Sequence, residues 1–334
     1  MTTADKITTS AEALAVAREL AGSIAATAVA RDRGRTPPHA ELAAIDRSGL
    51  LGIAVPAAYG GPDLPRSTVV EVVRILAAAD PAVAQQLLAH FVVTQAIIGA
   101  PEVDRIFADV LADGRVGNAT VERTTKRSID RETRVTRSGE GTWLLDGVKY
   151  YATGSLDAAW IAVAALDDDG HPATAFVRPG DRGVTLDLAD WSGFGQRASF
   201  SGTVRLARVP VELVLQEGPP PAEVPPLVLG AYDQALHAAI DIGIAGAALA
   251  DGAAFVRERS RPWFEADVER AADEPHVRRR FGELTTRLHA LEALLEHGAR
   301  LVDETVRDPA RWKYVHIGNH LLNGVAPPRL GVLY

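Results

Sequence analysis

Cysteine is absent from the sequence, and aromatic residues make up only 6% of its 334 positions. Without a thiol the chain can form neither a disulfide framework nor a thiolate metal site. The N-terminal segment has neither the apolar core nor the basic flank of a signal peptide. We therefore expect a cytoplasmic protein.

Long apolar runs and long basic runs are also missing. Acidic or basic residues interrupt each candidate stretch before it reaches the roughly 18 apolar residues of a membrane span. The net charge is −8, and no basic cluster could bind nucleic acid or an anionic membrane. These absences leave small molecules and other subunits as the expected partners.

Apolar residues are plentiful, at 47% of the chain, which is enough for a large core in two or three domains. Up to about Gly114 they recur at spacings of three and four, which is typical of helices. The predicted helices cover residues 10–31, a short segment after Pro37-Pro38 that carries Leu42, Ile45 and Leu50, and residues 67–79 and 81–99.

Ser67 and Asp80 are the expected N-caps of the last two helices. His90 falls inside the final one. A lone histidine in an apolar helix is more often a packed core residue than a catalytic one. The position of His90 alone does not decide between these two roles.

After Gly114 the pattern changes to short β-branched runs separated by turns, which predicts a compact antiparallel β domain. Asp146-Gly147 predicts a tight hairpin turn within residues 143–151. The period of two would then place Tyr151 and Thr153 on one face of the second strand, with Tyr150 on the other.

Residues 190–203 form a glycine-punctuated loop between two predicted strands. Its glycines permit close backbone approach, Trp191 and Phe194 offer flat surfaces, and several side chains offer hydrogen bonds. This combination suits a planar cofactor with polar edges. A β-turn region with one structural tryptophan is the alternative, and composition does not separate the two.

The C-terminal third begins with a proline-rich linker, residues 218–226, and continues into a mostly buried helix over residues 227–259. A second long helix, residues 273–306, carries an apolar stripe that includes Leu284, Leu288, Leu291 and Leu295. His316 and His320 have the spacing of a ligand pair but lack a third ligand nearby, so we expect no metal site.

The succession of helices, β domain and helices predicts an α+β fold that resembles the acyl-CoA dehydrogenase fold. Its expected domains are a helical one (1–113), a β domain (114–217) and a C-terminal helical one (218–334). Residues 147–154, 190–197, 260–264 and 308–314, together with Asn323-Gly324, resemble one branch: flavin-dependent monooxygenases similar to dibenzothiophene monooxygenase and, most closely, sulfur-acquisition oxidoreductases. The Gly-Ser-Asp signature of the dehydrogenases is missing from residues 121–130.

The resemblance implies a two-component monooxygenase that oxygenates a small organosulfur compound with O2, through a peroxide at flavin C4a. A separate flavin reductase would supply reduced FMN, since the sequence has no Gly-x-Gly-x-x-Gly nicotinamide site. FAD is the alternative cofactor. A homo-oligomer, either a dimer or a tetramer, is also implied.

Site residues follow from the same resemblance. The implied catalytic residues are His90, Asn118 and Thr153. The implied flavin-binding residues are Asn118, Tyr151, Thr153, Trp191 and Arg261, the last near the flavin phosphate. Trp191 and Thr153 should therefore share one cleft between the β domain and the helices.

The chain departs from the family pattern after the last long helix, where Asp303 runs directly into Asp308-Pro309 and about two helices are missing. Arg307 stands where the family has a second active-site histidine. An internal deletion and residues omitted from the sequence are both open explanations. Two alternative functions are therefore a catalytically weakened relative with a binding or oligomer role and an FAD-dependent acyl-CoA dehydrogenase. The leucine stripe is expected to lack its covering helices.

Overall fold

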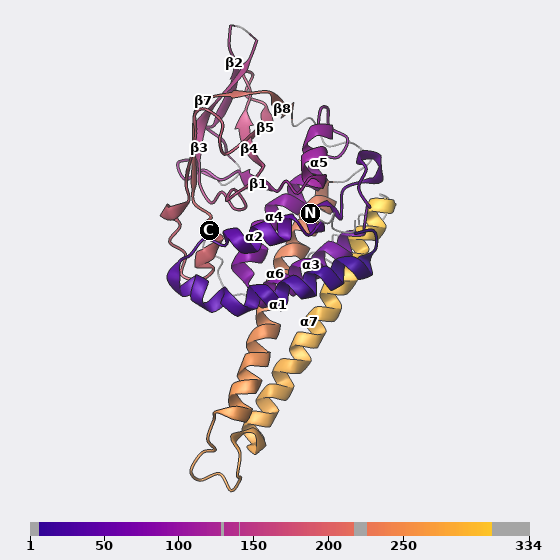
Figure 1. Ribbon diagram of the computed structural model, residues 1–334, viewed down its shortest axis with the longest axis vertical. Coiled ribbons are helices and arrows are strands. Elements are labelled where there is room, and N and C mark those ends of the chain that lie inside the picture. The colour runs from indigo at the N-terminus through magenta and orange to yellow at the C-terminus, as the bar shows by residue number, and fades with distance from the viewer. Residues whose placement is uncertain (1–6, 128–129, 140, 217–225, 309–334) are drawn as a thin grey trace.

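The computed structural model describes residues 7–127, 130–139, 141–216 and 226–308. Figure 1 shows a helical body, a twisted sheet at one end of it, and two long helices that project from the other end. The helices are α1 (Ser10–Gly34), α2 (His39–Asp46), α3 (Arg66–Ala79), α4 (Pro81–Ala96), α5 (Asp104–Leu111), α6 (Pro226–Glu258) and α7 (Pro275–Arg307). The strands are β1 (Val116–Ala119), β2 (Arg134–Arg137), β3 (Trp143–Lys149), β4 (Trp160–Leu166), β5 (Pro172–Val177), β6 (Val184–Asp187), β7 (Thr203–Val211) and β8 (Leu213–Gln216). Short 3-10 turns are η1 (Leu50–Gly52), η2 (Ala57–Tyr59), η3 (Leu188–Asp190), η4 (Arg197–Ser199) and η5 (Ala271–Asp273). The predicted acyl-CoA dehydrogenase-like order of elements is confirmed, although α5 was missed and Leu50 belongs to η1 rather than to α2.

The start of α4 is as predicted. The Asp80 side chain accepts hydrogen bonds from the backbone N–H groups of Ala82 and Val83, at 2.9 and 3.4 Å. The prediction that Ser67 caps α3 is wrong, because α3 begins one residue earlier and has no side-chain cap of its own. Instead the Asp303 carboxylate of α7 accepts a hydrogen bond from the backbone N–H of Ser67 at 3.3 Å. A residue distant in sequence therefore pairs with a free N–H group in the first turn of α3.

The sheet has the strand order β6-β7-β3-β2-β4-β5-β8, with β1 paired to β4. The prediction of a wholly antiparallel domain is wrong, because β1 and β2 both lie parallel to β4. A parallel pair needs a long connection, and the β2–β3 hairpin supplies it between β1 and β4. Trp160, Phe176 and Leu213 from the sheet join the core of the helical body, so sheet and helices pack as one unit.

The predicted hairpin turn at Asp146-Gly147 is also wrong. Both residues lie inside β3, which runs without a break and pairs with β7 through a bulge between Leu145 and Gly147. The chain turns earlier, where Ser138 N–H donates to the carbonyl of Thr142 at 2.8 Å. A glycine was required at position 147 for a different reason: a Cβ there would lie 2.4 Å from the Thr133 hydroxyl oxygen.

The last two helices, α6 and α7, form an antiparallel hairpin whose outer half leaves the body (Figure 1). The prediction that α6 is mostly buried holds only up to Gly243, where the helix packs on α3 and α4; the following residues are largely exposed. The leucine stripe of α7 is not bare, since Leu295 is buried and Leu288 and Leu291 pack against the helical core. The expected uncovered surface lies instead at the tip of the hairpin.

Two helices, Ser10–Gly34 and Val228–Glu258, are long and apolar enough to span a membrane by composition alone. This corrects the expectation that charged residues exclude every candidate. Both helices pack along α3, and 17% and 22% of their most apolar windows are buried. Residues 218–225 of the predicted proline-rich linker, His316, His320 and the motif after Asp308 lie outside the described residues, whereas the last linker residue, Pro226, begins α6.

Candidate functional site

The loop between β6 and β7 is held at both ends by Asp190. Its carboxylate accepts from the backbone N–H of Thr203 at 3.1 Å and from the Thr203 hydroxyl. Within the loop, the Trp191 indole N–H donates to the carbonyl of Gln196 at 3.1 Å. The half-buried tryptophan is therefore fixed by its own loop, whereas Phe194 at the tip is 98% exposed.

This loop lies against the helical body. The Arg35 guanidinium, just after α1, donates to the carbonyl of Trp191 at 3.2 Å, and the Asp32 carboxylate accepts from the backbone N–H of Arg197 at 3.1 Å. Gln86 of α4 is buried and donates through its amide to the carbonyl of Ser199. The loop therefore lies at the junction between sheet and helices.

Thr153 lies beside the loop through a chain of hydroxyl groups. Its Oγ1 donates to the Ser201 hydroxyl at 3.0 Å, and Ser201 in turn lies 3.1 Å from the Ser199 hydroxyl. The backbone N–H of Ala152 also bonds to the carbonyl of Gly202 at 2.9 Å. Thr153 and the Trp191 loop thus share one hydrogen-bonded region.

Asn118 joins the same region from β1. Its backbone N–H donates to the carbonyl of Thr153 at 3.1 Å, and its own carbonyl accepts from the Ser155 hydroxyl at 3.3 Å. The Asn118 side-chain oxygen is buried and has no hydrogen-bond partner in the part of the chain that the structure describes. A buried amide oxygen without a partner is costly, so this atom fits a site where a ligand supplies a donor.

Two glycines let these segments approach each other. A Cβ at Gly117 would lie 2.6 Å from the backbone of Gly154, and Gly154 itself has a φ of +78° and faces the carbonyl of Gln86. Only glycine allows both the close contact and the left-handed backbone. The Gln86 side-chain oxygen is a second buried acceptor without a partner among the described residues.

Aromatic rings form the outer wall of the site. The Tyr151 and Trp191 rings meet edge to face with centroids 6.3 Å apart. The predicted alternation of Tyr150 and Tyr151 across a strand is wrong, because β3 ends at Lys149 and Tyr151 has a φ of +55°. As a result both tyrosines contact the same side chain, the guanidinium of Arg123.

His90 is fully buried, and both of its ring nitrogens are occupied. Nε2 lies 2.9 Å from the carbonyl of Leu51, and Nδ1 accepts from the backbone N–H of Val116 at 3.1 Å. Burial lowers the pKa of His90 to about 4, so the ring is neutral at pH 7. In this arrangement His90 ties α4 to η1 and to the start of β1, and neither nitrogen is free to meet a reactant.

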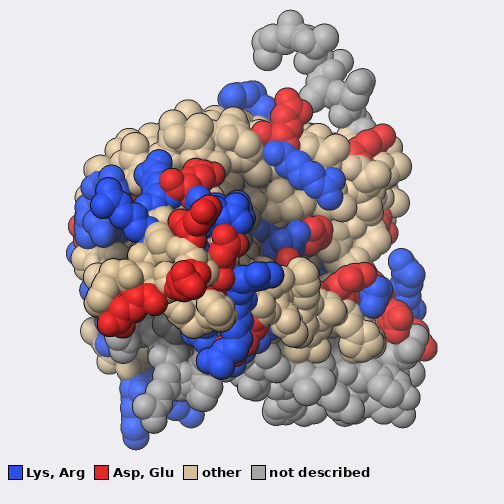
Figure 2. Space-filling view, turned by 90° about the horizontal axis from the view of Figure 1, so that it is seen from below, with Lys and Arg blue, Asp and Glu red and all other residues tan. Residues whose placement is uncertain are grey.

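Arg261 is not brought to the site within one chain. It is exposed in the segment that joins α6 to α7, and Figure 1 places this segment at the end of the molecule opposite the sheet. Seen from that end in Figure 2, basic and acidic side chains are interspersed rather than separated by sign. Arg261 could therefore approach only the site of another copy.

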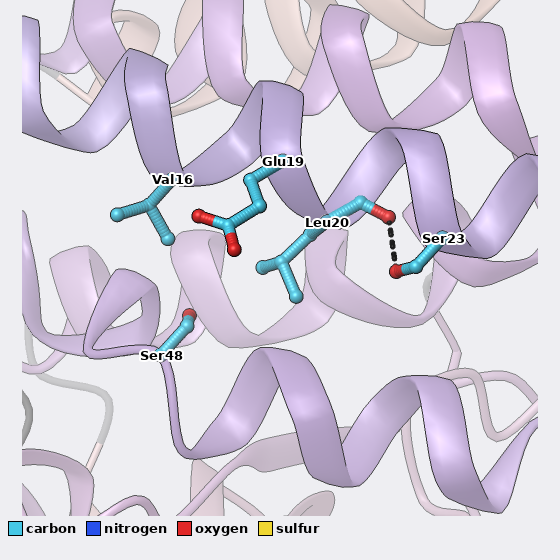
Figure 3. Close-up of a pocket in the computed structure, with 5 residues that line it drawn as sticks. All are labelled: Val16, Glu19, Leu20, Ser23 and Ser48. Atoms are coloured by element: carbon cyan, nitrogen blue, oxygen red, sulfur yellow. Dashed lines mark hydrogen bonds between the residues drawn. The ribbon is translucent and has the colours of Figure 1, made fainter.

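A cavity of about 270 Å³ opens on α1 and is lined by Val16, Glu19, Leu20, Ser23 and Ser48 (Figure 3). None of the predicted site residues lines it. Ser23 donates its hydroxyl to the carbonyl of Leu20 in its own helix, so the polar atoms there are already partly used. This shallow cavity is separate from the candidate site.

The sequence predicted Ser201 as a hydrogen-bonding group of the loop but not its contact with Thr153, and it did not predict Gln86 or Arg123 as site residues. Gln86 could have been noticed as one of three glutamines in a mostly apolar helix. Ser201 lies in the predicted loop but is distinguished only by its contact with Thr153. Arg123 carries no local signal, because its contacts depend on how Tyr150 and Tyr151 leave β3.

Comparisons with known proteins identify the family and the fold of this chain. Residues 9–113 match the profile of the acyl-CoA dehydrogenase N-terminal domain, and residues 235–315 match that of the C-terminal domain. Over 303 residues the chain is 32% identical to a protein of Pseudomonas putida described as the "probable FMNH2-dependent monooxygenase SfnC", covering 87% of this chain and 74% of that protein.

Two solved structures are similar over most of their length. Dibenzothiophene monooxygenase TdsC from Paenibacillus sp. A11-2, in complex with FMN and indole, has a TM-score of 0.84 at 27% identity, covering 94% of this chain and 82% of that one. Methanesulfinate monooxygenase MsuC from Pseudomonas fluorescens has a TM-score of 0.83 at 27% identity, covering 93% and 82%.

Proposed function

This chain belongs to the flavin-dependent monooxygenases with the acyl-CoA dehydrogenase fold, and on that premise we propose that it oxygenates a small organosulfur compound with FMNH2 and O2. The observation that carries the proposal is the junction of β1, residues 150–155 and the Trp191 loop. There the buried Asn118 oxygen has no partner among the described residues, Gly117 and Gly154 pack closely, and the Tyr151 and Trp191 rings form one wall. Amide acceptors, hydroxyl groups and flat walls fit the polar edge and planar body of a flavin.

Each residue has a distinct part in this proposal. Asn118 and Thr153 would hold the polar edge of the isoalloxazine ring, while Trp191 and Tyr151 would pack on its body and exclude water. When bound, reduced FMN supplies the electrons that activate O2. The chain contributes orientation and a dry surface, both of which protect reactive groups from hydrolysis. His90 acts as a positioning residue in this scheme, since it fixes the start of β1 and hence Asn118.

The source of reduced flavin and the state of assembly belong to the same proposal. A separate flavin reductase delivers FMNH2, and the enzyme works in the cytoplasm as a homo-oligomer in which Arg261 of one copy approaches the flavin phosphate of another. The exposed aromatic side chains beside Arg261 support such assembly, because Phe255, Trp263 and Phe264 are 56%, 61% and 80% exposed.

An anaerobic titration with FMNH2 followed by an O2 pulse tests the function. Product from methanesulfinate or dibenzothiophene would support it, whereas flavin binding without either product would favour a weakened relative. Tight binding of oxidised FAD would favour an acyl-CoA dehydrogenase. Asn118→Ala should lower the rate of product formation by about tenfold to a hundredfold. Thr286→Ala, an exposed threonine on α7, is the control and should leave the rate unchanged.

Sharing of Arg261 between copies has its own test. Arg261→Gln and Trp191→Ala should each be impaired alone. When the two variants are mixed and reassembled as a dimer, about a quarter of the sites would combine an intact Trp191 with an intact Arg261 from the partner. Recovery of activity on mixing supports sharing, and no recovery from a mixed assembly contradicts it.

A further inference from the structure

Arg123 lies at the aromatic wall of the candidate site. Its guanidinium carbon is 4.4 Å from the centroid of the Tyr150 ring and 5.1 Å from that of Tyr151. Tyr151 in turn contacts Trp191, which fixes the cation close to the proposed flavin site. An arginine stacked on aromatic faces keeps the N–H donors at its edge available.

The other stacked arginines of the described residues use those donors within the protein. Arg105 and Arg178, both on Trp160, bond to the carboxylates of Glu212 and Asp109 at 3.0 and 2.8 Å. Arg137, on Trp143, donates to the carbonyl of Gly141 at 3.1 Å. Arg123 differs from all three, because among the described residues its guanidinium has neither a carboxylate nor a carbonyl partner.

Carboxylates next to Arg123 in sequence do not neutralise it. Each is committed elsewhere: Glu122 to Lys149, Asp130 to Arg127, and Glu132 to Thr124. Glu122 also accepts from the backbone N–H groups at positions 132 and 133, which closes the base of the segment that begins with Arg123. The base is therefore held in place, and within the described ranges no acceptor occupies the N–H donors of the stacked Arg123 guanidinium.

We propose that the exposed Arg123 binds an oxyanion at the aromatic wall of the site, with its guanidinium edge as a two-pronged donor. The proposal rests on the proposed function for the identity of the anion, which is either the FMN phosphate or the anionic head of a sulfinate or sulfonate substrate. Both present oxygen pairs that match a guanidinium fork. In the second case Arg123 selects charged organosulfur substrates over neutral thiophenes.

Binding measurements on the intact protein separate the two sources. Dissociation constants for reduced FMN, reduced riboflavin and methanesulfinate are measured anaerobically for the wild type, Arg123→Gln and Arg123→Lys. Arg137→Gln is the matched control, since it removes an exposed arginine stacked on a ring far from the site. Loss of a charge-assisted pair predicts weakening of about tenfold or more for the ligand that carries the anion.

A weaker FMN affinity in Arg123→Gln, with riboflavin unchanged, identifies the phosphate. A weaker methanesulfinate affinity, with both flavins unchanged, identifies the substrate, and its KM should rise while the reaction with dibenzothiophene is unaffected. Arg123→Lys should recover only part of either loss, because an ammonium group lacks the fork. Unchanged affinities in Arg123→Gln, or a wild type that binds none of the three ligands, would overturn the proposal. Binding of flavin or methanesulfinate without an oxygenated product would instead contradict the proposed function, but not the assignment of Arg123 as an anion-binding residue.

Discussion

One ion pair beside the candidate site, Lys149–Glu122, is buried, whereas the ion pairs on the outer part of the α6–α7 hairpin, residues 244–287, lie in solvent. The side chains of Lys149 and Glu122 are 0% and 3% exposed and meet at 2.5 Å. On the outer hairpin, Arg279 and Glu283 are 81% and 44% exposed and lie 3.6 Å apart. Pairs of one basic and one acidic residue therefore lie in different surroundings at the two ends of the molecule, buried beside the site and solvated on the outer hairpin.

The difference follows from what each region must do. Burying two charges costs desolvation energy that their attraction rarely exceeds, so a buried pair is weak evidence for added stability. We infer that it is retained near the site because it fixes the backbone on which Arg123 and Tyr150 stand. The outer hairpin carries screened ion pairs and exposed aromatic side chains, a combination suited to covering by another surface.

The largest expected effect comes from breaking the buried pair. Lys149→Met would leave the Glu122 carboxylate without its cation, which should lower the free energy of unfolding by about 3–5 kcal/mol. Arg279→Met on the outer hairpin should change it by less than about 0.5 kcal/mol. Urea denaturation of both variants measures the contrast. Equal losses in the two would show that burial does not distinguish these regions.

A second test uses the pH dependence of stability. Burial raises the pKa of Asp46 from 3.8 to about 6, despite the opposing effect of Arg115. The contribution of Asp46 to the free energy of unfolding therefore falls as the pH rises from about 4 to 6. Burial lowers the pKa of His90 from 6.5 to about 4, so its contribution rises with pH between those values. In the wild type the two groups therefore change the free energy of unfolding in opposite directions as the pH rises.

Asp46→Asn removes only the contribution to the free energy of unfolding that falls with rising pH. The free energy of unfolding of this variant should therefore rise more steeply between pH 4 and 6 than that of the wild type, by at most about 3 kcal/mol for a shift of about two pKa units. A constant offset from the weakened contact with Arg115 does not affect the slope. Asp267→Asn, at an exposed position of the outer hairpin, is the control. Parallel profiles for Asp46→Asn and wild type would contradict the assignment.

Much of the fold was predictable because its signals are local. Asp80-Pro81 begins α4, and the leucine spacing predicted α7 from the sequence alone. The Asp146-Gly147 signal failed because pairing with β2 and β7 on both sides keeps that segment extended, which a local turn preference cannot overcome. Long-range pairing is invisible in a single sequence.

The site was predictable in part for the same reason. The loop that carries Trp191 was apparent from its glycines and polar groups, and its proximity to Thr153 followed from the resemblance. The remote place of Arg261 depends on the direction of two long helices, and the occupied nitrogens of His90 depend on Leu51 and Val116. Neither follows from local sequence, and the proposed positioning role of His90 rests on these two contacts.

A third test adds one carbon inside the site. Gly117→Ala would place a Cβ 2.6 Å from the backbone of Gly154, and backbone cannot move aside as a flexible side chain can. We expect a loss of roughly 1–3 kcal/mol in the free energy of unfolding, because β1 must shift away from residues 153–155. FMN affinity should fall with it, since Asn118 moves too. A variant with unchanged stability and FMN affinity would contradict the close packing assigned to this junction.

A smaller effect, of opposite sign to that of Gly117→Ala, is expected from the matching glycine substitution on the outer hairpin. Gly282 lies exposed within α7, and a Cβ there would meet nothing within 4 Å. Gly282→Ala should raise the free energy of unfolding by about 0.5–1 kcal/mol, because alanine loses less backbone entropy in a helix. FMN affinity should be unchanged, in contrast to Gly117→Ala. Light scattering on the same sample tests whether another copy of the chain covers this surface. An unchanged particle mass with increased stability agrees with an uncovered surface. A lower mass with decreased stability would show that another copy packs against Gly282, so that the outer hairpin is buried in the assembly as the site is.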